Sequence, residues 1–308
     1  FLRDLQKGRM LQTDETKFAL GENIAVTPGA VIYENELLQL IQYTPQTENV
    51  YSTPLFIVPP NINKYYILDL QPENSFVRYA LQQGMQVFLI SWRNPLQNDT
   101  DGILDASWGD YLQHGILTAL QVAQQVSNQK QLNTLGFCVG GTMLASALSL
   151  AQAKGEAPAA SLTLLTAMLD FHDVGVLSVF VDETLALLRE YQLAATRLML
   201  GSDLATTFSF LRPSELVWNY VASNYLQGKT PPPFDILFWN ADSTNLPGPF
   251  FTWYFRNTYL ENNLRLHGKV QVDGYPIDLS RLDVPVYIFA SEDDHIVPWR
   301  TAYASTQL

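Results

Sequence analysis

The segment at residues 135–141 limits the possible folds of this chain more than any other part of its sequence. It reads LGFCVGG and lies between an apolar run and a run with helical spacing. A strand, a sharp turn with a nucleophile at its apex, and a helix form a nucleophile elbow, and Cys138 takes the position that serine usually holds. The turn needs small residues beside its apex, which Gly136 and Gly140 provide. Because the N–H groups and the positive dipole end of the helix would face the thiol, we expect them to favour the thiolate.

A structural alternative stays open for Cys138. It is the only cysteine in the chain, so it has no partner for an intrachain disulfide. A free cysteine is most often a small buried apolar residue. The pattern G-x-C-x-G also occurs by chance, but the three glycines Gly136, Gly140 and Gly141 between a strand and a helix favour a catalytic nucleophile.

A regular alternation of predicted strands and helices surrounds this segment. Short apolar runs are typical of buried strands, and longer amphipathic runs are typical of helices. Their alternation from about residue 55 to residue 168 predicts a mostly parallel sheet with helices on both faces. Ligands of such sheets bind beyond the carboxyl ends of the strands, where Cys138 lies. The predicted strands here are residues 55–58, 86–92, 132–135 and 161–166, and the predicted helices are residues 75–83, 108–127 and 142–153.

Three regions are predicted around the elbow. Residues 1–169 form the first part of the core and begin with short strands within residues 23–29, 30–33 and 36–43. Residues 170–268 have few strand runs and many aromatic residues and prolines, which predicts a cap inserted over the catalytic edge of the sheet. A helical wing of the core is the alternative for this region. Residues 269–308 return to the sheet with a hairpin (269–272 and 277–279), a buried strand (286–290) and a polar loop.

The composition excludes several classes of function. The chain has 308 residues and a net charge of −12, which does not suit DNA or anionic membranes. Only 16% of its residues are charged, which leaves room for an apolar pocket, a subunit interface or contact with a hydrophobic material. No segment reaches the length of a membrane-spanning helix. A single cysteine fits a reducing cytoplasm, and neither a Cys/His metal cluster nor a G-x-G-x-x-G motif after the first strand is present.

A carboxylate is expected close to the nucleophile. A cysteine needs a base to become a strong nucleophile, and the base needs an orienting carboxylate. In this kind of site the acid follows the nucleophile in the chain and lies just after a late strand. Glu292, Asp293 and Asp294 all occupy such a loop, although a solvated acidic turn would explain them equally well.

The base is not found at the expected spacing. The histidine should follow the acid by the length of a strand and a loop. None of the four histidines meets this condition; they are His114, His172, His267 and His295. His295 directly follows Asp294 in the chain, and neighbouring side chains usually point in different directions, so this pair suits a catalytic relay poorly. We therefore expect the base to lie beyond Leu308, and the chain to be part of a longer protein.

Several long motifs in a fixed order resemble the catalytic domain of the class I polyhydroxyalkanoate synthases. They extend over almost the whole chain and are far more specific than the elbow alone. The motifs are PPNINKYYILDL (59–70), SWRNP (91–95), GFCVGG (136–141), FSFLRP (208–213), LFWN (237–240), NLPGP (245–249) and EDDHIVPW (292–299).

The resemblance implies an α/β-hydrolase core with a cap and a polymerising acyltransferase. Such enzymes join (R)-3-hydroxyacyl groups from coenzyme A thioesters into a polyester and release coenzyme A, with no further cofactor. Cys138 matches the acylated nucleophile and Asp294 the acid, whereas the family's histidine lies in a Gly-His-Ile motif farther on. The family's separate N-terminal domain is also expected outside this chain. The implied partners are the growing polyester and its granule surface in the cytoplasm, and a second copy in a homodimer.

Two other functions stay open, and both keep the predicted core. A cysteine-type thioesterase or hydrolase would pass the acyl group to water instead of a hydroxyl group. A non-catalytic granule-associated subunit would bind without reacting, although the intact elbow cysteine argues against it.

Elbow geometry also predicts the groups that bind the reacting oxygen. The backbone N–H of Val139 is one expected oxyanion donor. The second should come from the loop after the early strand, where Asn61 or Ile62 is the candidate. Coenzyme A carries phosphates, so an acidic chain needs a local cation, and Arg256 is the candidate; a structural salt bridge is the alternative for Arg256.

Overall fold

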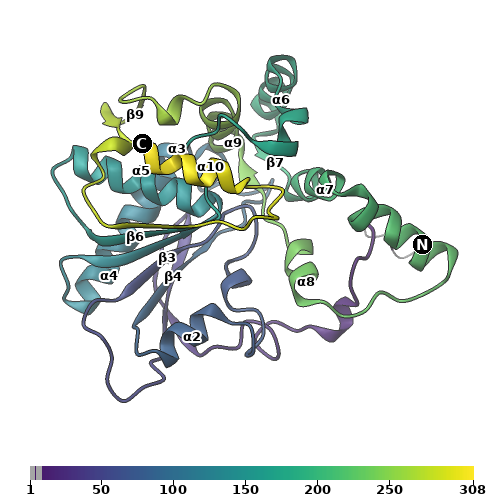
Figure 1. Ribbon diagram of the computed structural model, residues 1–308, viewed down its shortest axis with the longest axis horizontal. Helices are drawn as coiled ribbons and strands as arrows, with labels where there is room; N and C mark the ends of the chain where they lie inside the picture. Colours follow the sequence, from purple (N-terminus) through teal and green to yellow (C-terminus); the bar gives the residue numbers. More distant parts are fainter. Residues whose placement is uncertain (1–3, 5–8) are drawn as a thin grey trace.

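A seven-stranded sheet forms the centre of the protein (Figure 1). The structure is a computed structural model and describes residue 4 and residues 9–308. The strands of the sheet are β1 (Gly29–Glu34), β2 (Leu38–Tyr43), β3 (Leu55–Val58), β4 (Val87–Trp92), β5 (Leu132–Phe137), β6 (Ala159–Leu165) and β11 (Val286–Phe289). They lie in the order β1-β2-β4-β3-β5-β6-β11. The five strands from β4 to β11 are parallel, and β2 pairs antiparallel with β1 and β4. The predicted mostly parallel sheet is confirmed.

Helices cover both faces of this sheet. Figure 1 shows α5 and α10 on one side and α2 on the other. The helices around the core are α2 (Phe76–Gln82), α3 (Trp108–Asp110), η4 (Tyr111–Leu117), α4 (Thr118–Ser127), α5 (Val139–Ala153) and α10 (Trp299–Ala304). Short turns of 3₁₀ helix are η1 (Glu15–Lys17), η2 (Tyr65–Leu68), η3 (Ile103–Asp105), η10 (Leu279–Arg281) and η11 (Ser305–Gln307).

The alternation of side chains along β3 explains the two layers. Successive residues of a strand point to opposite faces of the sheet. Phe56 and Val58 are fully buried in the core that contains α5, while Leu55 and Ile57 pack in the core that contains α2. All four residues of this strand are therefore apolar, as expected for a central strand covered on both sides.

The long helix predicted at residues 108–127 is confirmed but is not uniform. It begins at a capping box, in which the Ser107 hydroxyl accepts from the backbone N–H of Asp110 and the Asp110 carboxylate accepts from that of Ser107. Its middle part, η4, has π-helical hydrogen bonds, and α4 then ends at Asn128 in a left-handed conformation. The amphipathic pattern predicted the extent of this helix but not its π segment.

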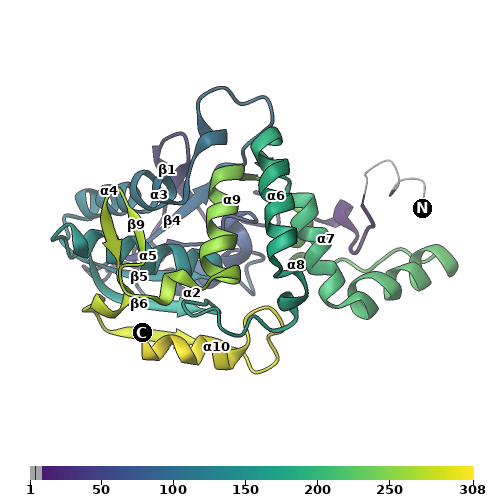
Figure 2. The ribbon, with the colours of Figure 1, turned by 90° about the horizontal axis from the view of Figure 1, so that it is seen from above.

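Residues 170–268 form a largely helical region beside the sheet. Figure 2 shows α6 and α9 side by side, and the two helices pack against each other. The division into core and cap at residues 169 and 268 stays an interpretation. The elements are η5 (Gly175–Phe180), α6 (Glu183–Thr196), β7 (Leu198–Met199), α7 (Gly201–Leu211), η6 (Ser214–Trp218), η7 (Val221–Leu226), α8 (Asp235–Ala241), β8 (Leu246–Pro247), α9 (Gly248–Phe255), η8 (Arg256–Leu260) and η9 (Asn263–Arg265).

Two sequence predictions about strands are wrong. Residues 23–26 form no regular strand; the backbone N–H of Ala25 instead donates to the carbonyl groups of Asp69 and Leu70. The strand predicted at residues 286–290 exists as β11, but it is not buried. Val286 and Tyr287 are 46% and 62% exposed, because β11 lies at the edge of the sheet with β6 as its neighbour.

The hairpin predicted near residue 270 is confirmed, but its second strand was predicted at residues 277–279 and lies two residues earlier, at residues 275–277. It consists of β9 (Val270–Val272) and β10 (Tyr275–Ile277), which pair antiparallel, and β10 packs against α5.

None of the helices in the described part of the chain combines the length and apolar character that crossing a bilayer requires.

Candidate active site

Cys138 lies at the apex of a sharp turn between β5 and α5. Its backbone angles are φ 54° and ψ −127°, in a region that residues with a side chain rarely adopt. Its backbone N–H donates to the carbonyl oxygen of Leu165 at 2.9 Å, which fixes the turn to the end of β6. Strained backbone of this kind persists where the surroundings hold it and is common at active sites. The strand, turn and helix expected of a nucleophile elbow are all present.

Close backbone contacts explain the glycines of the turn. A Cβ atom on Gly136 would lie 2.4 Å from the Cα atom of Gly141, and one on Gly140 would lie 2.3 Å from the carbonyl oxygen of Val58. Backbone atoms cannot move aside as a flexible side chain can. The elbow therefore has no room for any side chain at these two positions.

Protein groups around the Cys138 thiol oppose its ionisation. The side chain is partly exposed, yet burial raises the pKa of the thiol to about 11. A hydrogen bond from the Val139 N–H lowers this pKa, and the negative charge of Asp294 raises it further. The N-terminus of α5 was expected to lower the pKa of the thiol, but the loss of solvent around the buried thiol raises this pKa by more. With a pKa near 11, roughly one thiol in 10⁴ is ionised at pH 7, so the nucleophile needs a base.

The structure distinguishes Asp294 from the other two acidic residues of its loop. Glu292 and Asp293 are exposed, whereas Asp294 is half-buried and close enough to Cys138 to influence its pKa. Its Oδ1 atom accepts hydrogen bonds from the backbone N–H groups of Ile296 at 2.9 Å and Val297 at 3.0 Å. These bonds hold the carboxylate in place.

The histidines of the described chain do not complete this pair. The half-buried His295 has a lowered pKa, mainly because of burial and then because of the nearby Arg212 guanidinium. Within residue 4 and residues 9–308, no hydrogen bond or ion pair joins a histidine to Cys138 or to the Asp294 carboxylate. The other three contact different carboxylates: His114 with Asp110 at 3.9 Å, His172 with Asp170 at 3.5 Å and His267 with Asp278 at 2.9 Å.

The loop after β3 approaches the elbow, as the oxyanion prediction requires. The Trp92 indole N–H donates to the Pro59 carbonyl at 2.9 Å, and the Thr244 N–H donates to the Ile62 carbonyl at 2.9 Å. Between these anchors lies Asn61, whose side chain is 1% exposed and whose amide nitrogen and oxygen have no hydrogen-bond partner among the described residues.

A cavity of about 370 Å³ begins at the elbow and continues into residues 170–268. Both Val139 and Ile62 line it, so two of the predicted oxyanion residues border the same cavity, whereas Cys138 itself is not among the lining residues. Most of the other lining side chains are apolar and come from η5, α6, α7 and α9. They are Leu177, Phe180, Val181, Leu185, Ala186, Leu188, Arg189, Gln192, Met199, Leu204, Thr207, Phe208, Leu246, Phe250, Phe251, Tyr254, Phe255 and Tyr259.

Two tyrosines of this cavity were not predicted as site residues. Tyr254 and Tyr259 have ring centroids 5.8 Å apart. Burial raises the pKa of both phenols, and a negative charge on Cys138 would raise each of them further, so both lie near the nucleophile. The only signal in the sequence is the aromatic run around residue 254, which a packed helix would explain as well.

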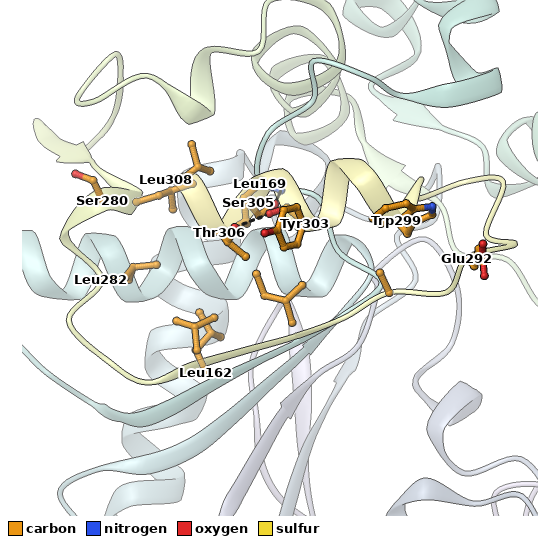
Figure 3. A pocket seen from close by; sticks show the side chains of 14 residues that line it. Leu162, Leu169, Ser280, Leu282, Glu292, Trp299, Tyr303, Ser305, Thr306 and Leu308 are labelled. Carbon is orange, nitrogen blue, oxygen red and sulfur yellow. Dashed lines mark hydrogen bonds between the residues drawn. The ribbon is translucent and has the colours of Figure 1, made fainter.

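A larger cavity of about 870 Å³ lies elsewhere, between β11 and α10. Figure 3 shows Trp299 and Tyr303 of α10 above the edge of the sheet, with Leu162 below. Its lining includes neither Val139 nor Ile62, so of these two cavities the smaller one adjoins the elbow.

Arg256 is surrounded by carboxylates. Its guanidinium contacts Glu190 at 2.7 Å, Glu261 at 2.9 Å and Glu183 at 3.1 Å, and these partners raise its pKa. The arrangement favours the salt-bridge alternative, since three acidic neighbours leave little positive charge for a phosphate. Binding of coenzyme A by Arg256 stays a prediction.

Comparison with known proteins agrees with this geometry. Residues 54–308 match the sequence model of the alpha/beta hydrolase fold. The chain belongs to the alpha/beta hydrolase family. Two solved structures show the same fold: a putative lipase from Sulfolobus solfataricus (TM-score 0.52, 15% identity, 87% of this chain and 86% of that chain) and MenH from S. aureus (TM-score 0.50, 14% identity, 89% and 86%). The predicted fold class is thereby confirmed.

The resemblance to polyhydroxyalkanoate synthases is also confirmed. Residues 1–80 match the model described as the poly-beta-hydroxybutyrate polymerase (PhaC) N-terminus. Poly(3-hydroxyalkanoate) polymerase subunit PhaC of Cupriavidus necator is 55% identical over all of this chain and 52% of its own length. The corresponding protein of Rhizobium meliloti is 44% identical over 96% of this chain and 48% of its own length. The chain thus spans about half the length of the curated relatives it matches.

Proposed function

We propose that this chain is the catalytic part of a polyester synthase. It would join (R)-3-hydroxyacyl groups from coenzyme A thioesters into polyhydroxyalkanoate and release coenzyme A. The observation that carries the proposal is the cysteine at the apex of the elbow, near Asp294, in a chain 55% identical to a poly(3-hydroxyalkanoate) polymerase subunit.

In the first step the Cys138 thiolate attacks the thioester carbonyl. A tetrahedral oxyanion forms, to which Val139 and either Asn61 or Ile62 would donate backbone N–H groups. The carbon–sulfur bond to coenzyme A then breaks, and coenzyme A leaves with a proton as the free thiol. One thioester replaces another in this step, so the exchange is nearly balanced in energy and suits repeated acyl transfer.

In the second step one acyl unit attacks another. A histidine oriented by Asp294 would remove the proton from the 3-hydroxyl group, and the resulting oxygen would attack the carbonyl of a neighbouring acyl thioester. An ester bond forms, a thiolate leaves, and the proton passes to it through the histidine. The raised pKa of Cys138 supports the need for such a base in the first step as well.

The histidine is proposed to come from outside these 308 residues. No described histidine forms a hydrogen bond or an ion pair with Cys138 or the Asp294 carboxylate, and the curated relatives are about twice as long as the region they share with this chain. Neither step as written needs a cofactor, because the coenzyme A thioester is the substrate.

The surroundings of the reaction are proposed on the same basis. The cavity beside the elbow is mostly apolar, which suits the acyl group and the growing polyester. The low content of charged residues suits a place at the surface of a polyester granule in the cytoplasm. Association of two copies, as a homodimer, is part of the proposal.

Product analysis tests the proposed function. The full-length protein would be incubated with (R)-3-hydroxybutyryl-coenzyme A, and released coenzyme A, insoluble polyester and soluble hydroxy acid would be measured. Polyester supports the synthase, soluble acid alone supports a thioesterase, and no coenzyme A release supports a non-catalytic subunit. Cys138→Ala should lose both coenzyme A release and polyester, while Asp293→Asn, altered at an exposed neighbour of the acid, should keep both.

A further inference from the structure

The cavity at the elbow changes from buried to exposed along its length. Near the nucleophile its walls are closed: Val139 and Tyr254 are each 7% exposed and Phe250 is fully buried. At η5 and α6 the walls reach the surface, where Phe180, Leu185 and Leu188 are 37%, 47% and 52% exposed. We call these last three side chains the apolar mouth.

The volume of the cavity is too small to hold a long product. A cavity of about 370 Å³ lies at the lower end of the range of ~300–1,000 Å³ for small-molecule sites. It can hold a short oligoester but not a polymer. A chain that grows on Cys138 must therefore leave the protein while it is still attached.

The chemistry of the mouth fits a polyester better than coenzyme A. Its three residues carry no charge, and Arg189, the one cation among the described lining residues, already pairs with Asp203 at 3.6 Å. A diphosphate would lose its hydration there without gaining a free positive charge. The repeat unit of a polyester has only ester oxygens, which accept hydrogen bonds, and Gln192 beside the mouth has an amide that can donate them.

On the basis of the proposed function, we infer that the growing polyester leaves the site between η5 and α6 through the apolar mouth. The acyl units next to Cys138 lie along Val139 and Tyr254, and older units pass Leu188 into the granule. Coenzyme A thioesters reach Cys138 by another route.

Helix α6 offers a matched pair of variants to test this inference. Leu188 lines the cavity, while its neighbour Leu187 does not and is equally exposed at 54%. Leu188→Asp places a short charged side chain in the proposed path of an apolar chain, and Leu187→Asp places the same charge on the same helix outside it. Because both positions are exposed, neither variant should disturb folding, and thermal melting of both proteins checks this.

Two readouts separate the exit route from the first chemical step. With (R)-3-hydroxybutyryl-coenzyme A, we expect Leu188→Asp to shorten the polymer at least about threefold, since a charge opposes passage of the apolar chain. The rate at which the first acyl group is transferred to Cys138 can be measured by mass spectrometry with limiting substrate. In Leu188→Asp this rate should stay within about twofold of the wild-type rate, because only longer chains reach the mouth. Leu187→Asp should match the wild type in both.

Each alternative result has a distinct meaning. Polymer of unchanged length from Leu188→Asp would overturn the exit route. Loss of the first acyl transfer in Leu188→Asp alone would also overturn it, because the mouth would then admit the substrate. If the wild-type protein itself made no polymer, the proposed function would fail instead, and the two failures are therefore distinguishable.

Discussion

The carboxylate of Asp294 lies close enough to Cys138 that its negative charge raises the pKa of the thiol. An acid in direct contact with a thiolate would oppose catalysis, since like charges repel. The pair makes chemical sense when a histidine stands between them, takes the thiol proton and is then stabilised as a cation by the carboxylate. The position of Asp294 therefore supports a three-membered site of which this chain supplies two members.

Replacing Asp294 by Asn should lower the pKa of the Cys138 thiol. Removal of a nearby negative charge favours the thiolate, so the pH at which alkylation by iodoacetamide reaches half its maximum should shift below the value of about 11. The alkylation rate of the 308-residue chain as a function of pH measures this shift. Asp293→Asn, at an exposed position, should leave the profile unchanged, and equal profiles for all three proteins would show that Asp294 does not influence the thiol.

Two substitutions at Asn61 separate its backbone from its side chain. Asn61→Leu keeps the N–H and removes a buried amide without hydrogen-bond partners, so the free energy of unfolding should rise by about 1 kcal/mol with activity retained. Asn61→Pro removes the N–H and should lower kcat roughly 10²-fold if this donor binds the oxyanion. Normal kcat in Asn61→Pro would assign the donor to Ile62, and loss of activity in Asn61→Leu would show that the side chain acts.

An alanine at Gly140 should break the elbow. The added methyl group would lie 2.3 Å from the Val58 carbonyl oxygen, and we expect a loss of about 3 kcal/mol in the free energy of unfolding. Gly155→Ala is the control, because its Cβ meets no atom within 4 Å and only its left-handed backbone, with φ 83°, adds a cost of about 1 kcal/mol. Urea unfolding measures both. Equal losses in the two variants would mean that the turn is less tightly packed than the structure indicates.

Truncation of Arg256 should weaken folding rather than substrate binding. Arg256→Ala removes three ion pairs and leaves three carboxylates near one another, so we expect a loss of about 1 kcal/mol in stability. The apparent affinity for acyl-coenzyme A should stay unchanged in the full-length protein. Arg281→Ala, which removes an exposed arginine 3.6 Å from Asp278, should change neither property. Weaker binding of acyl-coenzyme A in Arg256→Ala alone would instead support the phosphate contact.

The sequence predicted the parts of the fold that strong local signals determine. The strand at residues 55–58, the helix capped by Ser75 and the elbow at Cys138 agree with β3, α2 and the turn before α5. Each combines an unbroken apolar run or a capping residue with a clear end. Because these signals act over a few residues, they can be recognised without knowledge of the rest of the chain.

Properties that depend on distant residues could not be predicted. The apolar run at residues 286–290 looks like a central strand, yet its exposure depends on which strands flank it in the sheet. The thiol of Cys138 was expected to be acidic because its helix is close in sequence, whereas the burial that raises its pKa comes from the surrounding fold. The three carboxylates around Arg256 come from residues up to 73 positions away in the chain.

Acylation of Cys138 tests the central claim most directly. The full-length protein would be mixed with (R)-3-hydroxybutyryl-coenzyme A, quenched in acid and digested, and the peptide that contains residue 138 would be weighed by mass spectrometry. We predict one or more hydroxybutyryl units on Cys138, which mild treatment with hydroxylamine should remove because it cleaves thioesters, and no such unit at residue 138 of Cys138→Ala. Release of coenzyme A and formation of polyester with an unmodified Cys138 would contradict the proposed chemistry.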